Sequence, residues 1–452
     1  MFIKKIKTPG LAHLSYVVGA AGQAVVIDPR LDCEVYIDEA AAEGCRIIHI
    51  LETHRNEDLV TGSAALAELT DAQVYHGPDA AGEVVYADII SEGDTITMGP
   101  LTIKAIQTPG HTFDSMSYAL YDGDFGDSAV AVFTGDTLFV GDVGRTDFYP
   151  DQAEKVAGLL YDSLQKLMQL GDQALIYPAH GAGSVCGNDM ADREFSSIGY
   201  ERQHNPMLQI DSRDAFIEQK CSEKHEMPPY FERMEALNLS GAEMVNRNLT
   251  ATPLTIEAFT ALQKDGLVLD VRSVSAFMGA HIPHSLAMPE SMVPAYAGWL
   301  IDYGEDILLV ADDQYQADDV VRHLSRLDFR GIQGALIPSL TGWAKAANQF
   351  SCLATVNADT VEDRVSSDDN DWQLIDVRSE HEFESGHIEG AKNIYLGRLP
   401  GKLAQLNPEK HHTVMCESGA RATIAASVLL RAGFKNVDVF LGAMGAWRSI
   451  FK

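Results

Sequence analysis

Residues 267–288 read LVLDVRSVSAFMGAHIPHSLAM, and residues 373–394 read QLIDVRSEHEFESGHIEGAKNI. An Asp-Val-Arg-Ser run, a Phe and a His-Ile pair match between these stretches at one constant offset, which is the mark of an internal repeat. Each stretch begins with a short apolar run, and a second apolar run follows at 307–310 or 413–415. Strands that alternate with helices form parallel sheets. The chain is therefore predicted to end in two copies of one α/β domain.

The repeat leaves a longer, different N-terminal part. A chain of 452 residues has room for about three domains of roughly 150 residues each. The pattern of the repeat breaks near residues 250 and 350. We therefore expect three domains, at residues 1–248, 249–352 and 353–452.

The charge of the chain excludes some classes of partner. Lys and Arg total 34 and Asp and Glu total 65, so the net charge is −31, and such a surface repels phosphate backbones and anionic lipid. We expect neither nucleic-acid nor membrane binding. Six cysteines without a CxxC pair indicate a reducing compartment rather than a disulfide framework. No run of about 18 apolar residues is present, so a cytoplasmic protein is expected.

Short apolar runs in the first 245 residues each lead into a loop with His, Asp, Gly or Pro. Such runs occupy residues 25–29, 47–51, 101–103, 130–133 and 175–177. Strands that deliver polar residues to one end predict a layered sheet protein with a site along its rim. Four loops stand out, namely THRNEDL at 53–59, TPGHT at 108–112, FTGDT at 133–137 and PAHG at 178–181. One such His is more often a hydrogen-bonding residue than a ligand, but four loops together indicate a metal site.

These loops resemble those of the metallo-β-lactamase superfamily, and most closely its persulfide dioxygenase and glyoxalase II branch. The Ile-Asp-Pro at 27–29, FTGDTLF at 133–139 and GRTDF at 144–148 add to the resemblance. It covers about the first 245 residues and implies an αββα sandwich. The family's first loop reads THxHxDH, whereas this chain has Asn56 and Leu59 at the second and third His positions.

These two departures change the expected chemistry. Leu cannot ligate a metal, and an amide oxygen is a poor ligand beside imidazole, so a two-zinc hydrolytic site loses its second metal. His54, His111 and Asp136 remain, and two imidazoles with one carboxylate form the facial triad of non-haem Fe(II) oxygenases. The resemblance implies one Fe(II) per chain at these residues. A decayed, metal-free domain is the alternative.

Other residues of this domain are candidates for supporting roles. Asp58 and His180 stand at the family's second metal site and, without partners, are expected to orient ligands by hydrogen bonds. Cys186 is placed either to meet substrate sulfur or to serve as a small buried hydrophobe. Arg145 is a candidate to hold a carboxylate of the thiol carrier, or forms an ion pair with Asp147 or Asp142. Tyr200 is a further candidate substrate contact.

The last repeat carries a nucleophile. Cys416 lies between an apolar run and a helical stretch, where backbone N–H groups favour the thiolate. Gly419 permits a tight loop, and Arg421 adds positive charge for an anionic sulfur substrate. The loop Cys-x-x-Gly-x-Arg and the DVR and GHI motifs resemble the rhodanese family, which implies that Cys416 is a persulfide carrier.

The middle repeat lacks this chemistry. Residues 222–351 contain no cysteine, and the Cys416 position falls on Ala311 or, with a slip of one residue, on Asp312. This copy cannot carry a persulfide. We expect it to pack between its neighbours or to shape the approach to one of the two sites.

The whole arrangement resembles the multidomain persulfide dioxygenase–sulfurtransferases of sulfide detoxification. This resemblance implies oxidation of a small-molecule thiol persulfide with O2 to sulfite, followed by rhodanese transfer to thiosulfate, in a homo-oligomer that is a dimer or a tetramer. Two alternatives stay open, namely a zinc thioester hydrolase of the glyoxalase II type and a non-catalytic metal domain joined to a sulfur-carrier rhodanese.

Overall fold

The structure is a computed structural model that describes residues 1–80, 82–184, 186–187, 190–242, 249–367 and 370–451. The chain divides into two compact units, Met1–Arg247 with Arg326–Asp328, and Asn248–Ser325 with Phe329–Lys452. The expected domain boundary at residue 248 lies outside the described residues. Among the described helices, none combines the length and the apolar character that a membrane span requires.

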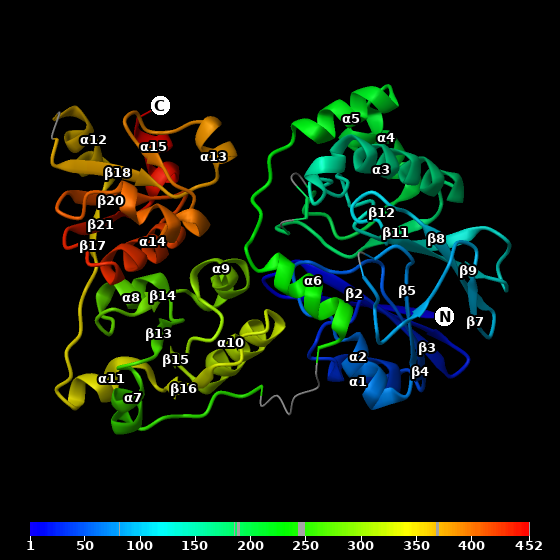
Figure 1. The fold of residues 1–452 in the computed structure, drawn as a ribbon, viewed down its shortest axis with the longest axis horizontal. Helices are drawn as coiled ribbons and strands as arrows, with labels where there is room; N and C mark the ends of the chain where they lie inside the picture. The colour runs from blue at the N-terminus through cyan, green and yellow to red at the C-terminus, as the bar shows by residue number, and fades with distance from the viewer. Residues whose placement is uncertain (81, 185, 188–189, 243–248, 368–369, 452) are drawn as a thin grey trace. The chain divides into compact units, whose positions relative to one another are not determined.

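The described part of the first unit contains two six-stranded sheets (Figure 1). The first has the order β1-β2-β3-β4-β5-β6, with strands Phe2–Thr8, His13–Ala20, Gln23–Ile27, Arg46–Leu51, Gln73–His76 and Asp88–Ile89. The second has the order β12-β11-β10-β9-β8-β7, with strands Ser196–Ser197, Leu175–Pro178, Ala129–Gly135, Met116–Asp122, Leu101–Gln107 and Thr95–Met98. Alternating apolar residues of both sheets share one buried core, which includes Val18, Val25, Leu101, Leu120 and Phe133.

Helices cover the two sheets on opposite sides (Figure 1). Helices α1 (Glu34–Ala42) and α2 (Ser63–Thr70) pack on the first sheet, in a core with Val17, Val26 and Ile50. Helices α3 (Ala153–Leu167), α4 (Ile198–His204) and α5 (Arg213–Ser222) lie on the side of the second sheet, and α6 (Phe231–Ser240) follows them. Short 3-10 turns stand at Pro150–Gln152, Met168–Leu170 and Pro206–Gln209. The layers are therefore helix, sheet, sheet and helix, which confirms the predicted αββα sandwich.

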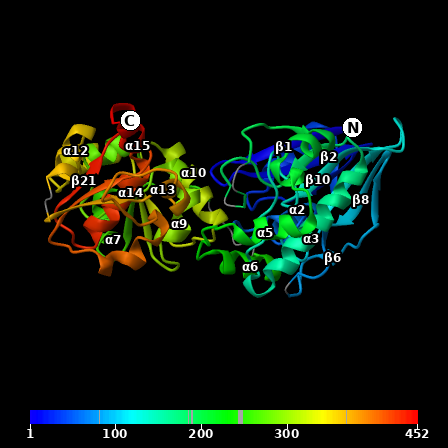
Figure 2. The same ribbon diagram turned by 90° about the horizontal axis from the view of Figure 1, so that it is seen from above.

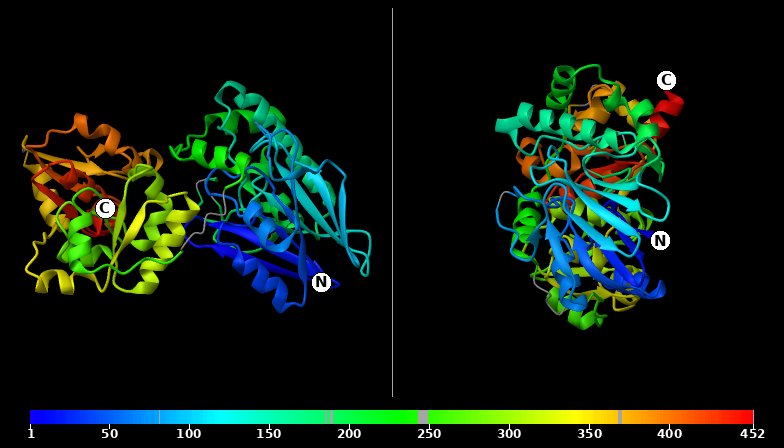
Figure 3. Two further views of the ribbon diagram at one scale, coloured as in Figure 1. Left: turned by 60° about the horizontal axis from the view of Figure 1, so that its bottom comes forward. Right: turned by 90° about the vertical axis from the view of Figure 1, so that its right-hand side faces the viewer.

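The described part of the second unit contains two parallel sheets (Figure 3, green to red). One has the order β14-β13-β15-β16, with strands Leu286–Ala287, Leu267–Asp270, Ile307–Val310 and Ile332–Leu336. The other has the order β17-β21-β20-β18-β19, with strands Ala354–Val356, Val437–Phe440, His411–Met415, Trp372–Asp376 and Lys392–Asn393. A parallel bridge from Pro253 to Ala335 stands where β17 pairs with β21. The two sheets thus share one topology, as the repeat predicts.

The helices of the second unit follow the same pattern. Those of the first copy are α7 (Ile256–Leu262), α8 (Val274–Gly279), α9 (Val293–Leu300), α10 (Gln314–Arg326) and α11 (Ser339–Lys345). Those of the second copy are α12 (Ala358–Ser366), α13 (Glu380–Glu384), α14 (Ala420–Arg431) and α15 (Ala443–Ile450), with α14 against β21 (Figure 2). Short 3-10 turns stand at Glu290–Met292, Leu396–Arg398 and Pro400–Gln405.

The repeated sequence motif has a structural role in both copies. The last residue of β13 and of β18 is an Asp that pairs with the Arg two residues later. The distance is 2.6 Å for Asp270 and Arg272 and 2.7 Å for Asp376 and Arg378. Each His stacks on the Phe four residues before it, with ring centroids 4.0 Å apart in the first copy and 3.9 Å apart in the second. The motif therefore stabilises the turn after the strand and is not a reactive site.

The strand register identifies the residue that stands at the nucleophile position of the middle copy. Val377 N–H donates to the carbonyl of Met415, and Val271 N–H donates to the carbonyl of Val310. Met415 and Val310 are therefore equivalent, so Ala311 rather than Asp312 corresponds to Cys416.

Candidate metal centre and sulfur-transfer loop

The first loop is held in place by buried polar contacts with the sheet. Thr53 donates its N–H to Asp28 Oδ1 at 2.7 Å and its hydroxyl to Asp28 Oδ2 at 2.8 Å. A Cβ on Gly135, which has a φ of 53°, would lie 2.7 Å from the Thr53 Cβ, so the absence of a side chain there allows the β10 end to approach this loop. These contacts bring His54 and Asp136 to the same part of the rim.

Four buried side chains converge at this point, namely His54, Glu57, His111 and Asp136. His111 Nε2 lies 3.5 Å from Asp136 Oδ2 and 3.1 Å from Glu57 Oε1. His54 Nε2 lies 3.9 Å from Asp136 Oδ2 and 3.8 Å from Glu57 Oε2. The three predicted ligands thus lie together, and the sequence analysis missed the fourth residue.

Hydrogen bonds to the far ring nitrogens indicate the protonation of both imidazoles. The Thr53 hydroxyl proton goes to Asp28, so Thr53 Oγ1 accepts the Nδ1–H of His54 at 2.9 Å. The carbonyl of Arg145 can only accept, so it binds the Nδ1–H of His111 at 3.0 Å. When these rings are neutral, the Nε2 lone pair of each faces the carboxylates.

This arrangement of acceptors fits a cation. Two imidazole lone pairs and two carboxylates meet in a buried space, where acceptors without a proton or a metal between them repel. Burial lowers the pKa of His54, which favours the neutral form that ligates a metal. Burial also lowers the pKa of His111, but the charge of Glu57 outweighs it and raises that pKa. The residues therefore fit a divalent ion, with imidazole and carboxylate donors suited to iron or zinc.

A second donor group consists of Asp58, His180 and Cys186. His180 Nδ1 bonds to Asp136 Oδ1 at 2.8 Å, and its Nε2 lies 3.0 Å from Asp58 Oδ2. Burial lowers the pKa of His180, but these two carboxylates outweigh burial and raise the pKa well above its usual value. His180 orients Asp136 by hydrogen bonding, whereas among the described residues His180 Nε2 and Asp58 Oδ1 are buried without a hydrogen-bond partner.

Cys186 is a buried thiol in contact with the first donor group. Its Sγ donates to Glu57 Oε1 at 3.3 Å, and its side chain is fully buried. Burial raises the pKa of the Cys186 thiol well above its usual value, and the charges of Glu57 and Asp136 raise it further. The group is therefore a protonated thiol that orients Glu57 in this state, and a direct role toward substrate sulfur stays a prediction.

Asn56 and Leu59, at the positions of the two missing histidines, are held through their backbone carbonyls. Leu59 is buried, and the side-chain amide of Asn238 donates to the carbonyls of Asn56 at 2.7 Å and of Leu59 at 2.8 Å. Asn238 lies on α6, so this helix fastens the end of the first loop. Among the described residues, Asn56 Oδ1 is buried without a hydrogen-bond partner.

A buried imidazole fastens the start of the same loop. His76 Nδ1 bonds to Glu52 Oε2 and His76 Nε2 bonds to Asp114 Oδ2, both at 2.8 Å. Asp114 Oδ2 also accepts the backbone N–H of Arg55. Burial lowers the pKa of His76, but the two hydrogen-bonded carboxylates raise it to about 10. This residue was not predicted, because its two partners come from other loops, far from it in the sequence.

Arg145 and Tyr200 occupy different surroundings. Arg145 is fully buried, and Asp147 grips it at two points, both at 2.7 Å, while Phe148 lies under its guanidinium. This is the ion-pair role of the two that the sequence left open. Tyr200 lies on α4 with 45% of its surface exposed and contacts the side chains of Arg193 and His204. Substrate contacts of either residue stay predictions.

A pocket beside the β1–β2 hairpin reaches His180 of the second donor group. Its lining includes Thr8, Ala12, His13, Tyr16 and His180. His13 is fully buried, its Nε2 has no hydrogen-bond partner in the described part of the chain, and its ring meets the edge of His180 at 5.5 Å. His13 is thus a further functional candidate. The sequence analysis missed it because no recognisable motif surrounds it.

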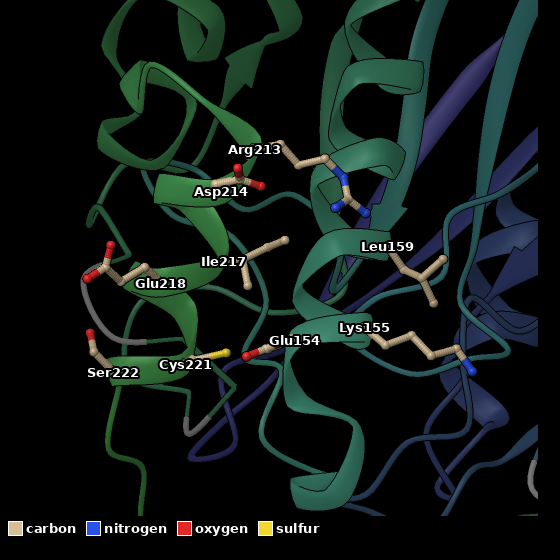
Figure 4. Close-up of a pocket in the computed structure, with 9 residues that line it drawn as sticks. All are labelled: Glu154, Lys155, Leu159, Arg213, Asp214, Ile217, Glu218, Cys221 and Ser222. Atoms are coloured by element: carbon tan, nitrogen blue, oxygen red, sulfur yellow. The ribbon is translucent and has the colours of Figure 1, made fainter.

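Another groove lies between α3 and α5 (Figure 4). Figure 4 shows Arg213 reaching from α5 toward α3, where its guanidinium binds Asp162 at 3.1 Å. Cys221 lies in the same groove, beside charged residues of both helices. None of its nine lining residues belongs to either donor group, so the groove is a seam between two packed helices.

In the second unit, Cys416 follows β20 and precedes α14. The Gly419 N–H donates to Cys416 Sγ at 3.1 Å. Gly419 has a φ of 114°, which a residue with a side chain rarely adopts. The loop therefore aims a backbone donor at the sulfur.

Arg421 is already paired. Its guanidinium makes two hydrogen bonds of 2.7 Å to Glu382, and Glu382 also caps α13 through Ser379. Tyr296 of the middle copy hydrogen-bonds to Arg421 and Tyr395. The charge of Arg421 is therefore compensated in this structure, and the middle copy helps to position it.

Comparisons with known proteins agree with both halves of the chain. The Metallo-beta-lactamase superfamily matches residues 8–180, and the Rhodanese-like domain matches residues 357–450. The mitochondrial persulfide dioxygenase ETHE1 of Bos taurus is 30% identical over 233 residues, which are 50% of this chain and 83% of that protein. A hydroxyacylglutathione hydrolase of Rhodopseudomonas palustris is 35% identical over 166 residues, which are 34% of this chain. The chain spans only 60% of the length of that hydrolase.

A solved structure extends the likeness beyond the first unit. The crystal structure of a metallo-beta-lactamase from Staphylococcus aureus has a TM-score of 0.67 and 28% identity, and it covers 74% of this chain and 98% of its own. This share is larger than Met1–Arg247 alone, so the likeness includes part of the repeated region.

The His76 clamp, formed by His76 with Glu52 and Asp114, generates a stability prediction. Replacing His76 with Ala leaves Glu52 and Asp114 buried without a counter-charge, so unfolding should become easier by about 3–5 kcal/mol at pH 7. The pKa of His76 is about 10 in the folded chain and about 6.5 when unfolded. The contribution of its charge is therefore complete below pH 6.5 and is lost as the pH rises toward 10.

Urea unfolding of the wild type and His76→Ala at pH 6, 8 and 10 measures this difference, which should shrink at the highest pH. His49→Ala is the control, since burial lowers the pKa of His49 and its contribution does not change above pH 7. A His76 difference that is constant over the whole range contradicts the charged clamp.

Proposed function

Because the chain belongs to the metallo-β-lactamase superfamily, in the family of the ETHE1 persulfide dioxygenases, and ends in a rhodanese domain, we propose that it is a persulfide dioxygenase with sulfurtransferase activity. The single observation that supports this most is the set of buried lone pairs of His54, His111 and Asp136 beside the missing second-site histidines. The proposed cofactor is one Fe(II) per chain, held by these three residues.

The proposed oxidation converts a thiol persulfide, O2 and water into thiol, sulfite and two protons. A ferrous ion supplies open coordination positions and redox chemistry for sulfur and O2. Thr53 Oγ1 and the Arg145 carbonyl orient the His54 and His111 rings by accepting their Nδ1–H groups. His180 holds Asp136, and the buried site excludes bulk water.

The proposed transfer takes place at Cys416. Its thiolate attacks the outer sulfur of a second thiol persulfide and releases the thiol, which leaves a persulfide on Cys416. Sulfite then attacks that sulfur, forms thiosulfate and releases the thiolate. The product of the first proposed reaction, sulfite, is thus a substrate of the second, and one chain carries both reactions.

A zinc thioester hydrolase is a second candidate, favoured by the 35% identity with hydroxyacylglutathione hydrolase. Against it stand Asn56 and Leu59, of which Leu59 is buried and offers no ligand. Elemental analysis of protein purified without oxygen separates the two, since one iron per chain supports the dioxygenase and two zinc ions per chain support the hydrolase.

Loss of His111 should separate the two activities. In His111→Ala, oxygen uptake with a thiol persulfide should fall by more than about 100-fold. Loss of a residue that only hydrogen-bonds to a metal ligand lowers activity by about 10–100-fold. Thiosulfate–cyanide sulfur transfer should stay unchanged, because Cys416 lies in the other unit. An oxygen electrode and a thiocyanate assay measure the two rates. Continued oxygen uptake in the folded variant refutes the role of this ligand.

Loss of the nucleophile should change the product. In Cys416→Ser, oxygen uptake should continue while sulfite accumulates in place of thiosulfate, because a hydroxyl does not form the persulfide. Chromatography of the sulfur anions after complete reaction measures this ratio, with Cys352→Ser, an exposed thiol outside the loop, as the control. An unchanged share of thiosulfate refutes the coupling of the two steps.

A further inference from the structure

Glu57 has an unexplained place in the proposed metal centre. It is 1% exposed and stands three residues after His54 in the first loop. Its Oε1 lies 3.1 Å from His111 Nε2 and its Oε2 lies 3.8 Å from His54 Nε2. Both carboxylate oxygens therefore face the ring nitrogens that carry lone pairs.

A hydrogen bond accounts for only part of the arrangement, namely the 3.1 Å contact between His111 Nε2 and Glu57 Oε1. The carbonyl of Arg145 takes the Nδ1 proton of His111, so in a neutral ring Nε2 has no proton to donate to Glu57. Within the described ranges, Glu57 Oε2 is buried without a hydrogen-bond partner, as is His54 Nε2. Leaving such atoms buried and unpaired is unfavourable. A cation between these atoms would pair with all of them at once.

The surroundings also hold Glu57 in place. The Cys186 thiol donates to Oε1 at 3.3 Å, which leaves the second oxygen directed at the centre. Asp136 contributes another carboxylate within reach of the same point. Two carboxylates balance the charge of a divalent ion, whereas without one they repel each other.

We propose that Glu57 is a fourth protein ligand of the ion, so that the centre is His54, Glu57, His111 and Asp136 rather than three residues alone. The inference rests on the metal centre of the proposed function. A fourth protein ligand would leave fewer positions on the ion for small molecules than three ligands would, and it would add a second carboxylate to balance the charge of a divalent ion.

The experiment uses the full chain, freed of metal and titrated with Co(II), whose visible absorption reports its ligands. In Glu57→Gln and Glu57→Ala, Co(II) affinity should fall by more than about 100-fold and the absorption bands should shift. Loss of a residue that only hydrogen-bonds to a ligand lowers metal affinity by about 10–100-fold. Glu57→Asp should retain part of the affinity, since it keeps a carboxylate.

Asp58→Asn is the matched control, because Asp58 is the neighbouring buried carboxylate and contacts His180 instead of the four donors. Its Co(II) spectrum should match that of the wild type. If the Glu57 variants keep the wild-type spectrum, Glu57 is not a ligand, even where the affinity falls by about 10–100-fold.

A second measurement does not depend on the folding of any variant. In a crystal structure of the Co(II)-loaded wild type, a Glu57 oxygen should lie about 2.0–2.2 Å from the ion, the usual distance for a carboxylate ligand. A separation above about 3 Å overturns the inference. A wild type that binds no Co(II) overturns the metal centre itself, whereas Co(II) binding through Glu57 without oxygen uptake by the iron-loaded chain refutes the proposed function alone.

Discussion

The first unit depends on one constraint, which is that buried acceptors with no proton between them require a cation. His54, His111, Asp136 and Glu57 bring lone pairs to one point inside the protein. Such a point is unfavourable in a low-dielectric interior, so the fold uses hydrogen bonds from other residues to keep these groups in place. Thr53 accepts the Nδ1–H of His54 and donates its own hydroxyl to Asp28. The Arg145 carbonyl accepts the Nδ1–H of His111.

The second donor group meets the same constraint with a proton. His180 lies between Asp136 and Asp58, at 2.8 Å from Asp136 Oδ1 and 3.0 Å from Asp58 Oδ2. Asn56 and Leu59 stand in place of the two missing histidines. The side chain of Asn238 donates to the backbone carbonyls of both. The first loop is therefore buried and hydrogen-bonded at both positions although these two histidines are absent.

The second unit shows how a duplicated domain keeps its fold after losing its chemistry. Both copies retain the Asp-Arg pair and the stacked Phe and His, because these contacts hold the turn after the first strand. The nucleophile position has no such structural duty, so Ala311 stands there without damage to the sheet. The middle copy still supports its neighbour, since Trp299 packs against Gly397 and Tyr395.

The sequence by itself determined the αββα sandwich, the repeated α/β domain, and the candidate residues His54, His111, Asp136 and Cys416. Strand periodicity and loop motifs are local signals, so they can be recognised along the chain. Only the tertiary structure decided the places of Glu57, His13 and His76, the pairing of Arg145 with Asp147, and the compensation of Arg421 by Glu382. These depend on which side chains from distant loops share a buried space, and on which atom of each pair holds the proton. Neither property is visible in the order of residues.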